Sequence, residues 1–369
     1  MVKVIIKKST YSYEELKQNI TSILDSLNTG LIKEGTRVLI KPNFLLAYPP
    51  DKAVTTHPLV VKAIAEYVLN LGASVQISDS SGSPTNIFNQ ILKVGGYQDA
   101  LKGLDVTFKD FTRSVMVNTA SSFKNIEIAE DALKAEVIIN AAKLKTHTQM
   151  RLTLAVKNLF GTIVGLKKPQ WHMKVGENRE KFAELLVTLY SLLKPQINIL
   201  DGILAMEGDG PGSSGIPRNM GVLMGSSDAV TLDMAVCEML NIAPLWLYTN
   251  KAALKLDLIK DYTIEGEMDE VTGFVFPKET SMLFGPPVAR KFMRKHLTTR
   301  PKNVDGACKL CNSCVKICPA QAITNDGKKL IFNYEKCIRC YCCQEICPHK
   351  AIEIYEPLMG KTIMKMFSK

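Results

Sequence analysis

The strongest constraint in this sequence is a cysteine pattern that occurs twice near the C-terminus. Each copy has the spacing Cys-x2-Cys-x2-Cys-x3-Cys-Pro, the first from Cys308 to Cys318 and the second from Cys337 to Cys347. Three thiolates two residues apart on a tight loop can hold three corners of one cube, while the fourth points to a neighbouring cube. The pattern therefore predicts two 4Fe–4S clusters, as in bacterial ferredoxins.

We assign four ligands to each cluster and take the last one from the other copy of the pattern. The first set is Cys308, Cys311, Cys314 and Cys347, and the second is Cys337, Cys340, Cys343 and Cys318. A zinc site usually has two separated Cys-x2-Cys pairs, and disulfides are rare inside cells, so both alternatives fit the repeated pattern less well. Cys342 is in excess, and we expect it to be a buried neighbour of a cluster.

Chain length and net charge indicate which classes of protein this chain can belong to. A chain of 369 residues is long enough for two or three domains. The formal charge of +10 falls to about +6 once the cluster thiolates and cluster cores are counted. The basic residues are scattered and lack the interleaved aromatic residues of a nucleic-acid reader. We therefore expect no nucleic-acid partner.

The N-terminal apolar run is too short for a signal peptide. No apolar stretch approaches the roughly 18 residues of a membrane span. Iron–sulfur clusters also survive best in a reducing compartment. We therefore expect a cytoplasmic protein without a transmembrane segment.

Short apolar runs alternate with amphipathic segments along most of the chain. We predict strands at 2–7, 37–43, 74–78, 105–110, 136–140, 196–200 and 221–225, and helices at 13–27, 58–71, 178–194 and 230–240. Asp201-Gly202 is expected to end the strand at 196–200. The alternation predicts a layered α/β body with a mostly parallel sheet, followed by an α+β ferredoxin-like domain with two clusters.

Three regions follow from this pattern. We place the α/β body at 1–295, the ferredoxin-like domain at 301–356 and a C-terminal tail at 357–369. Residues 265–300 are expected to form a connector that lies across the body. The tail carries apolar residues and is expected to pack back on the protein.

Ligands of open α/β sheets bind beyond the carboxyl ends of the strands. The polar residues at those predicted ends are Lys41, Asn43, His57, Asp79, Ser80, Lys143, Lys145, His147, Asp201 and Asp209. Lys143, Lys145 and His147 alternate and so share one face of an extended segment. They indicate an anionic ligand, or else an exposed basic strand end. His57 can equally begin a helix, and Asp79 can cap one.

Lys157 and Asn158 interrupt an otherwise apolar run from Leu154 to Gly161. A buried lysine needs a counter-ion or a lowered pKa, so Lys157 is either paired in the core or faces a ligand. A match to Gly-x-Gly-x-x-Gly at 210–215 contains Pro211 and opens no helix. We therefore reject a dinucleotide site there.

Several blocks of the body, taken in order, resemble the domain-of-unknown-function 362 family. They are Arg37–Asn43, Thr56–Pro58, Lys143–His147, Leu154–Gly161 and Asp201–Pro211. The resemblance implies an iron–sulfur protein, often with a two-cluster ferredoxin tail, and supplies no substrate. The body also resembles the nickel-dependent lactate racemase superfamily, which would make His57 and His147 acid–base residues and Lys145 a cofactor or anion contact.

Together these observations predict a redox enzyme that passes electrons from two 4Fe–4S clusters to a substrate or cofactor in the body. The candidate catalytic residues are His57, His147 and Lys157, and the candidate cofactor contacts are Lys41, Asn43, Asp79, Lys143, Lys145 and Asn158. A flavin, a nucleotide or a further metal could occupy the body, with a ferredoxin or reductase as redox partner and an anionic small molecule as ligand. Two alternatives stay open: an electron-transfer subunit that docks on a larger enzyme, and a racemase- or lyase-like enzyme with structural or sensing clusters.

Overall fold

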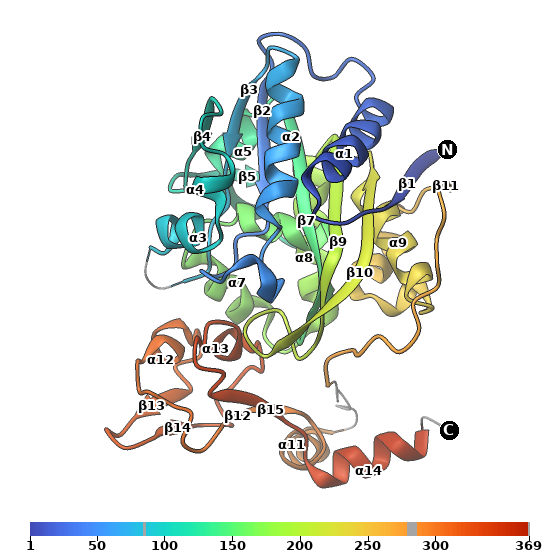
Figure 1. Ribbon diagram of the computed structural model, residues 1–369. Helices are drawn as coiled ribbons and strands as arrows, with labels where there is room; N and C mark the ends of the chain where they lie inside the picture. Colours follow the sequence, from blue (N-terminus) through green and yellow to red (C-terminus); the bar gives the residue numbers. More distant parts are fainter. Residues whose placement is uncertain (84–85, 279–285, 368–369) are drawn as a thin grey trace.

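The computed structural model describes residues 1–83, 86–278 and 286–367. The strands of its main sheet are β1 (Val2–Lys8), β2 (Arg37–Pro42), β3 (Ser74–Ile77), β4 (Val106–Phe108), β7 (Val137–His147), β8 (Arg151–Thr153), β9 (Ile197–Gly208), β10 (Gly215–Ser226) and β11 (Tyr262–Glu265). Their order is β11-β1-β10-β9-β7-β2-β3-β4, with β8 paired to β7. Neighbours are parallel except where β10 meets β1 and β9, and where β8 meets β7. The predicted mostly parallel α/β body is confirmed (Figure 1).

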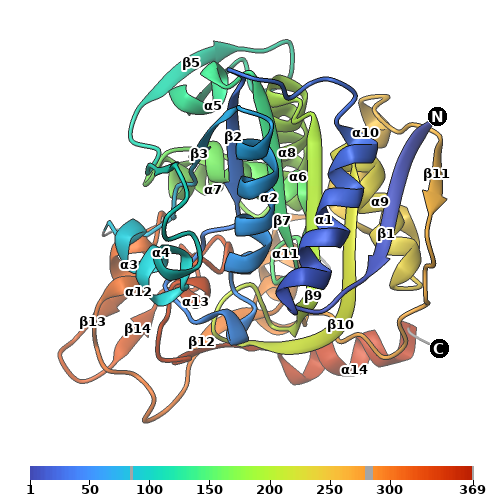
Figure 2. The ribbon, with the colours of Figure 1, turned by 45° about the horizontal axis from the view of Figure 1, so that its top comes forward.

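Helices cover both faces of this sheet (Figure 2). One face carries α1 (Tyr13–Leu27), α2 (Pro58–Asn70), α3 (Phe88–Val94) and α4 (Tyr97–Ala100). The other carries α6 (Ala155–Asn158), α7 (Lys167–Val175), α8 (Arg179–Leu193), α9 (Ala229–Met239) and α10 (Tyr248–Lys255). On α1, apolar residues at helical spacing, such as Leu16, Ile20 and Ile23, are buried as predicted. Each face of the sheet thus has its own apolar core.

The remaining elements of the body are short. A hairpin of β5 (Ser114–Asn118) and β6 (Asn125–Ala129) stands apart from the main sheet and leads into α5 (Glu130–Lys134). Single 3-10 turns occur at η1 (Pro50–Lys52), η2 (Leu159–Thr162) and η3 (Pro244–Trp246). Of these, η2 follows α6 directly and thereby belongs to the wall of the site described below.

Three central strands, β7, β9 and β10, are longer than the sequence pattern predicts. The expected end of β9 at Asp201-Gly202 is wrong, because β9 continues to Gly208 and forms a hairpin with β10. The sheet becomes irregular at that place, since the register between β7 and β9 shifts between Lys143 and Lys145. β7 likewise continues to His147, so the alternating basic residues belong to a fully buried strand.

The cysteine-rich module lies below the main sheet in Figure 1. It contains β12 (Arg300–Asn303), α12 (Ser313–Ile317), β13 (Ile323–Asn325), β14 (Leu330–Phe332), α13 (Cys342–Glu345) and β15 (Ile352–Tyr355). β12 pairs with β15 and β13 with β14, both antiparallel. Two further helices, α11 (Pro287–His296) and α14 (Leu358–Phe367), contact each other. The predicted connector and tail extend through 279–285 and 368–369, which lie outside the described residues.

Candidate functional site

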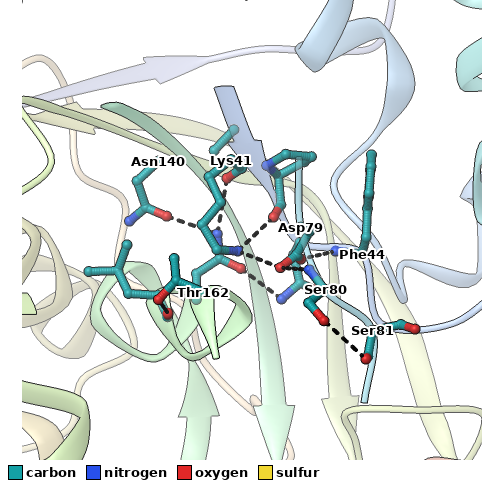
Figure 3. A network of polar contacts seen from close by, with 12 residues as sticks. Lys41, Phe44, Asp79, Ser80, Ser81, Asn140 and Thr162 are labelled. Atoms are coloured by element: carbon teal, nitrogen blue, oxygen red, sulfur yellow. Dashed lines mark hydrogen bonds and ion pairs between the residues drawn. The ribbon is translucent and has the colours of Figure 1, made fainter. Parts of the chain in front are cut away.

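The carboxyl ends of β2 and β3 meet at a buried ion pair (Figure 3). Lys41 Nζ lies 3.0 Å from Asp79 Oδ1, and both side chains are almost fully buried. The Asp79 carboxylate also accepts hydrogen bonds from the backbone N–H groups of Phe44 and Ser80, each 2.8 Å long. Because a cation and two amides satisfy it, Asp79 holds the loops after both strands together. It does not cap α3, which begins further along the chain at Phe88.

Asn158, the amide of the polar pair in the apolar run 154–161, connects α6 to β7 and to the end of β2. The Asn158 side chain donates to Asn140 Oδ1 (2.8 Å) and accepts from Asn43 Nδ2 (2.9 Å). Gly161 packs so closely on the Lys41–Asp79 pair that a Cβ atom at this position would overlap both side chains. This position therefore requires glycine.

A cavity lies between this network and the cysteine-rich module. Its walls bound about 780 Å³ of space between protein atoms, a part of which is open to solvent. The body contributes Asn43, Phe44, Leu45, Leu46, Asp79, Ser80, Gly82, Lys145, His147, Thr153, Lys157, Asn158, Phe160, Gly161, Lys168, Pro169, His172 and Pro211, and the module contributes Ile317, Cys342, Glu345 and Ile346. Seven polar residues singled out from the sequence thus line one cavity, and Lys41 lies directly behind Asp79.

Lys157 faces this cavity without a carboxylate partner. Its Nζ atom stands over the rings of Phe160 and Phe182, 5.2 and 5.8 Å from their centroids. Among the described residues no hydrogen bond or ion pair to this side chain is found. Burial lowers the pKa of Lys157, and the nearby Glu345 partly offsets that effect. Lys157 thus lines a cavity and is not ion-paired to any described residue of the core, while a role in holding a ligand stays a prediction.

Lys145 and His147 point from β7 into the same cavity. Lys145 Nζ donates to two neutral oxygens, Asn43 Oδ1 (2.7 Å) and the Val54 carbonyl (2.5 Å). His147 Nδ1 accepts from the backbone N–H groups of Gln149 and Met150, so the neutral ring carries its proton on Nε2. That Nε2 lies 3.2 Å from Glu345 Oε1, although without hydrogen-bond geometry. Burial, and then Lys157, hold the pKa of His147 well below its usual range.

Four further polar residues of the cavity were not predicted from the sequence: Thr153, Lys168, His172 and Glu345. Lys168 donates to the Ser80 carbonyl, and burial lowers its pKa to about 7. His172 Nδ1 and Thr153 Oγ1 are buried and have no partner among the described residues. Lys168 and His172 lie one turn apart on α7, a helical spacing that could have signalled a shared face. No local pattern marks Thr153 or Glu345.

Three of the other predicted residues, His57, Lys143 and Asp201, form a second cluster, whereas Asp209 pairs with Lys278. Lys143 Nζ lies 2.7 Å from Asp201 Oδ2, and the backbone N–H of His57 donates to the same oxygen at 2.8 Å. Tyr11 OH donates to Asp201 Oδ1, and its ring stacks on His57 with centroids 3.7 Å apart. His57 Nδ1 accepts from the Leu59 N–H at the start of α2. Neither His57 nor Lys143 is among the residues that line the cavity.

The cysteines predicted for the first cluster gather around one small cavity of the module. Its lining includes Cys308, Cys311, Cys314 and Cys347. Backbone N–H groups of Leu310 and Ala351 donate to Cys308 Sγ and Cys347 Sγ, as suits sulfurs that carry negative charge. The ten cysteines form no disulfide. These residues fit the cluster that the sequence predicts.

The second cysteine set is also compact. Burial and the neighbouring Cys340, Cys337 and Cys318 raise the pKa of the Cys343 thiol well above its usual value. The N–H of Ala322 donates to Cys318 Sγ at 3.2 Å. Within the described part of the chain, no three His, Cys, Asp or Glu side chains converge as ligands of a single metal ion would. Thiolates around a cube stand further apart than the ligands of one ion.

The rejected glycine-rich match is the loop that docks the module on the body. β10 follows it instead of a helix, which confirms that it is no dinucleotide fingerprint. Ser213 Oγ donates to the Cys347 carbonyl (2.8 Å), and Gln344 Nε2 donates to the Asp209 carbonyl (2.7 Å). Gly212 packs against the backbone of Glu345, where a Cβ atom would clash. This loop therefore fixes α13 over the cavity.

Comparison with protein families now places the chain. The model of the family described as "Domain of unknown function (DUF362)" matches residues 38–238. The chain belongs to this DUF362 family. A 4Fe-4S dicluster domain matches residues 300–348. The protein is therefore an iron–sulfur protein whose C-terminal module binds 4Fe–4S clusters.

Two individual proteins are similar to this DUF362 member. The thylakoid-associated protein sll1697 of Synechocystis sp. is 35% identical over 264 residues, which are 70% of this chain and 81% of that protein. The lactate racemase apoprotein of Thermoanaerobacterium thermosaccharolyticum aligns with a TM-score of 0.39 and 13% identity, over 62% of this chain and 57% of that chain. The racemase-like roles of His57 and His147 stay predictions. Among the residues described, no helix is both long and apolar enough to span a bilayer.

Proposed function

We propose that this DUF362 protein is an iron–sulfur redox enzyme that passes electrons from two 4Fe–4S clusters to a small molecule held in the cavity. One observation carries the proposal: the cavity wall includes Ile317 and Cys342. These residues directly precede Cys318 and Cys343, two predicted ligands of the second cluster. Bound clusters would supply single electrons. A molecule in the cavity would therefore contact the residues next to those ligands.

The first cysteine set suggests where electrons enter. Cys311 is the exposed cysteine of the module, whereas Cys340 and Cys343 are buried. A redox partner protein, such as a ferredoxin or a reductase, would therefore dock beside Cys311. The two sets would then lie between that partner and the cavity.

The body supplies groups for proton transfer and binding. Lys168 has a pKa of about 7, so it can give or take a proton near neutral pH. His147 stays neutral, and its Nε2–H faces Glu345 at the module's surface. Lys157 lies over two aromatic rings and can bind a negatively charged group. A simple electron carrier would require neither a proton-transfer group nor an anion-binding lysine in such a cavity.

The test begins with the full chain purified without oxygen. About eight irons per chain, together with a released flavin, nucleotide or further metal, would identify a resident cofactor of the cavity. If nothing organic is released, the reduced protein is mixed with small organic acceptors, and the return of the oxidised cluster absorption is followed. We expect one class of acceptor to react much faster with the native protein than with Lys157→Gln. Methyl viologen, which needs no cavity, should react equally with both.

Lys174→Gln is the matched control, because it makes the same change at an exposed lysine of α7 that does not line the cavity. If every acceptor reacts with Lys157→Gln, His147→Asn and the native protein at the same rate, the cavity has no role. The protein would then be an electron-transfer subunit that docks on a larger enzyme.

The ligand sets have their own test. Cys340→Ala should remove or convert one cluster and lower the iron content from about eight towards about four per chain. Cys342→Ala should leave both clusters intact, because we assign Cys342 to the cavity wall. Loss of all iron in Cys342→Ala would show that the assigned sets are wrong.

A further inference from the structure

The cavity has more lysine side chains than carboxylates to pair with them. Lys145, Lys157 and Lys168 all line it. Lys145 and Lys168 donate to neutral oxygens, and Asp79 is already paired with Lys41. Glu345 is then the one carboxylate left for three lysines among the described lining residues, and burial lowers the pKa of all three lysines. Buried charge without a partner is costly, so an incoming anion would be favoured here.

The surroundings of Lys157 also provide neutral hydrogen-bonding groups. His172 packs against the same two rings, with its ring centroid 5.6 Å from that of Phe160 and 4.5 Å from that of Phe182. Burial, and then Lys157, lower the pKa of His172 to about 3, so its imidazole is neutral. Its Nδ1 atom and Thr153 Oγ1 have no partner in the described residues, and both residues line the cavity. Buried polar atoms without partners indicate a missing ligand or water.

We propose that the cavity binds a small organic anion through a carboxylate or phosphate group. Lys157 and Lys168 hold the anionic group, while His172 and Thr153 bind a neutral polar part of the molecule. Leu45, Leu46 and Pro169, which also line the cavity, suit its apolar part. This inference takes the cavity of the proposed function as its site and adds the chemical class of the molecule bound there.

The test is direct binding to the oxidised, cluster-loaded full chain. Glycerate probes a carboxylate site and glycerol phosphate a phosphate site, and both also carry neutral hydroxyl groups for His172 and Thr153. Sodium chloride at equal ionic strength is the reference. Isothermal titration calorimetry should give saturable binding of one probe to the native protein. Lys157→Gln should weaken it at least tenfold, Lys157→Arg should restore part of it, and Lys174→Gln should leave it unchanged. Thr153→Val removes only a hydroxyl and should weaken it a few-fold.

Iron content and cluster absorption of each variant verify that it is folded. If Lys157→Gln is lost on purification, Thr153→Val and His172→Phe provide the same comparison. Binding of neither probe to the native protein, or equal binding to native protein and Lys157→Gln, overturns the anion site but leaves electron transfer to a neutral acceptor intact. Binding that depends on Lys157, without reoxidation of the reduced clusters by any anionic acceptor, supports the anion site and instead contradicts the redox function.

Discussion

Lys143 and Lys145 lie two residues apart on the same face of β7, and each is 1% exposed, yet their surroundings differ. Lys143 Nζ has a carboxylate at 2.7 Å and a tyrosine hydroxyl at 3.1 Å, in a site closed by Tyr11 and His57. Lys145 has two neutral oxygens and faces a cavity that Lys157 and Lys168 share. Burial of a lysine therefore does not by itself indicate function. What distinguishes the candidate site is a lysine that lies at the wall of a cavity and has no carboxylate partner among the described residues.

The two histidines show the same contrast. His57 uses Nδ1 to cap α2 and its ring to stack on Tyr11. His147 also satisfies Nδ1 with backbone N–H groups, but its Nε2 faces the module's Glu345 at the cavity. The buried charges of the Asp201 cluster are thus paired within the cluster. The lysines of the cavity lack such partners in the described part of the chain, and the following changes test this difference.

The largest effect is expected for Asp201→Ala. The change leaves Lys143 buried without its counter-ion, which typically costs about 3–5 kcal/mol of unfolding free energy. Urea unfolding measures this loss. Asp269→Ala, which breaks the exposed Lys8–Asp269 pair, is the control and should change stability by less than about 1 kcal/mol. Equal losses of unfolding free energy in both variants would show that the buried pair stabilises the fold no more than the exposed pair.

Gly161→Ala tests the packing of the cavity wall on the Lys41–Asp79 pair. The added Cβ would overlap the Lys41–Asp79 pair, and such overpacking costs about 1–3 kcal/mol. Gly82→Ala is a control near the same cavity, because a Cβ there makes only an ordinary contact with the Lys168 side chain. Thermal unfolding should separate the two variants. An unchanged melting temperature for Gly161→Ala would show that the ion pair can move aside.

The pH dependence of the cavity follows from Lys168. Its folded-state pKa of about 7 lies below the usual value of 10.5. Anion binding that needs its ammonium form should therefore weaken up to about tenfold per pH unit above pH 7. In the window between 7 and 10.5 the unfolded chain holds a proton that the folded chain has released, so Lys168 contributes stability that rises with pH. Titrations at several pH values check both signs, and pH-independent binding would exclude Lys168.

The smallest stability change is expected for Lys157→Met. The lysine has no ion pair among the described residues, so an apolar side chain of similar length should change the unfolding free energy by less than about 1 kcal/mol or increase it. Anion binding should nevertheless be lost. A stability loss as large as that of Asp201→Ala would mean that Lys157 stabilises the fold as strongly as the Lys143–Asp201 pair does.

Much of the fold was accessible from sequence periodicity. The helix at 13–27, the start of α2 at Pro58 and the alternation that indicates a parallel sheet all depend on local patterns, which burial of one face preserves. The length of β9 was not accessible. Asp201-Gly202 is a typical strand end, and only pairing with β10 and β7 carries the strand past it.

The candidate site likewise has residues that could be predicted from the sequence and residues that could not. The polar residues after β2, β3 and β7 could be predicted because parallel strands bring their carboxyl ends to one edge. Lys168, His172 and Glu345 could not, since they come from helices whose contact with that edge is set by packing. Thr153 reaches the edge because β8 pairs with β7, where it lies opposite Lys145. Glu345 in particular reaches the cavity only because the loop at 210–215 docks the module there.

By itself, the sequence determined the cluster chemistry, because the ligand spacing of a cube is local and leaves few alternatives. It also determined the layered class of the body, because periodicity of apolar residues is local too. Tertiary structure alone decided which buried lysine has a counter-ion, which histidine faces a cavity and which cysteines lie next to it. Those properties depend on side chains far apart in the chain, such as Lys143 with Asp201 and His147 with Glu345, and charge pairing is set by distance in space.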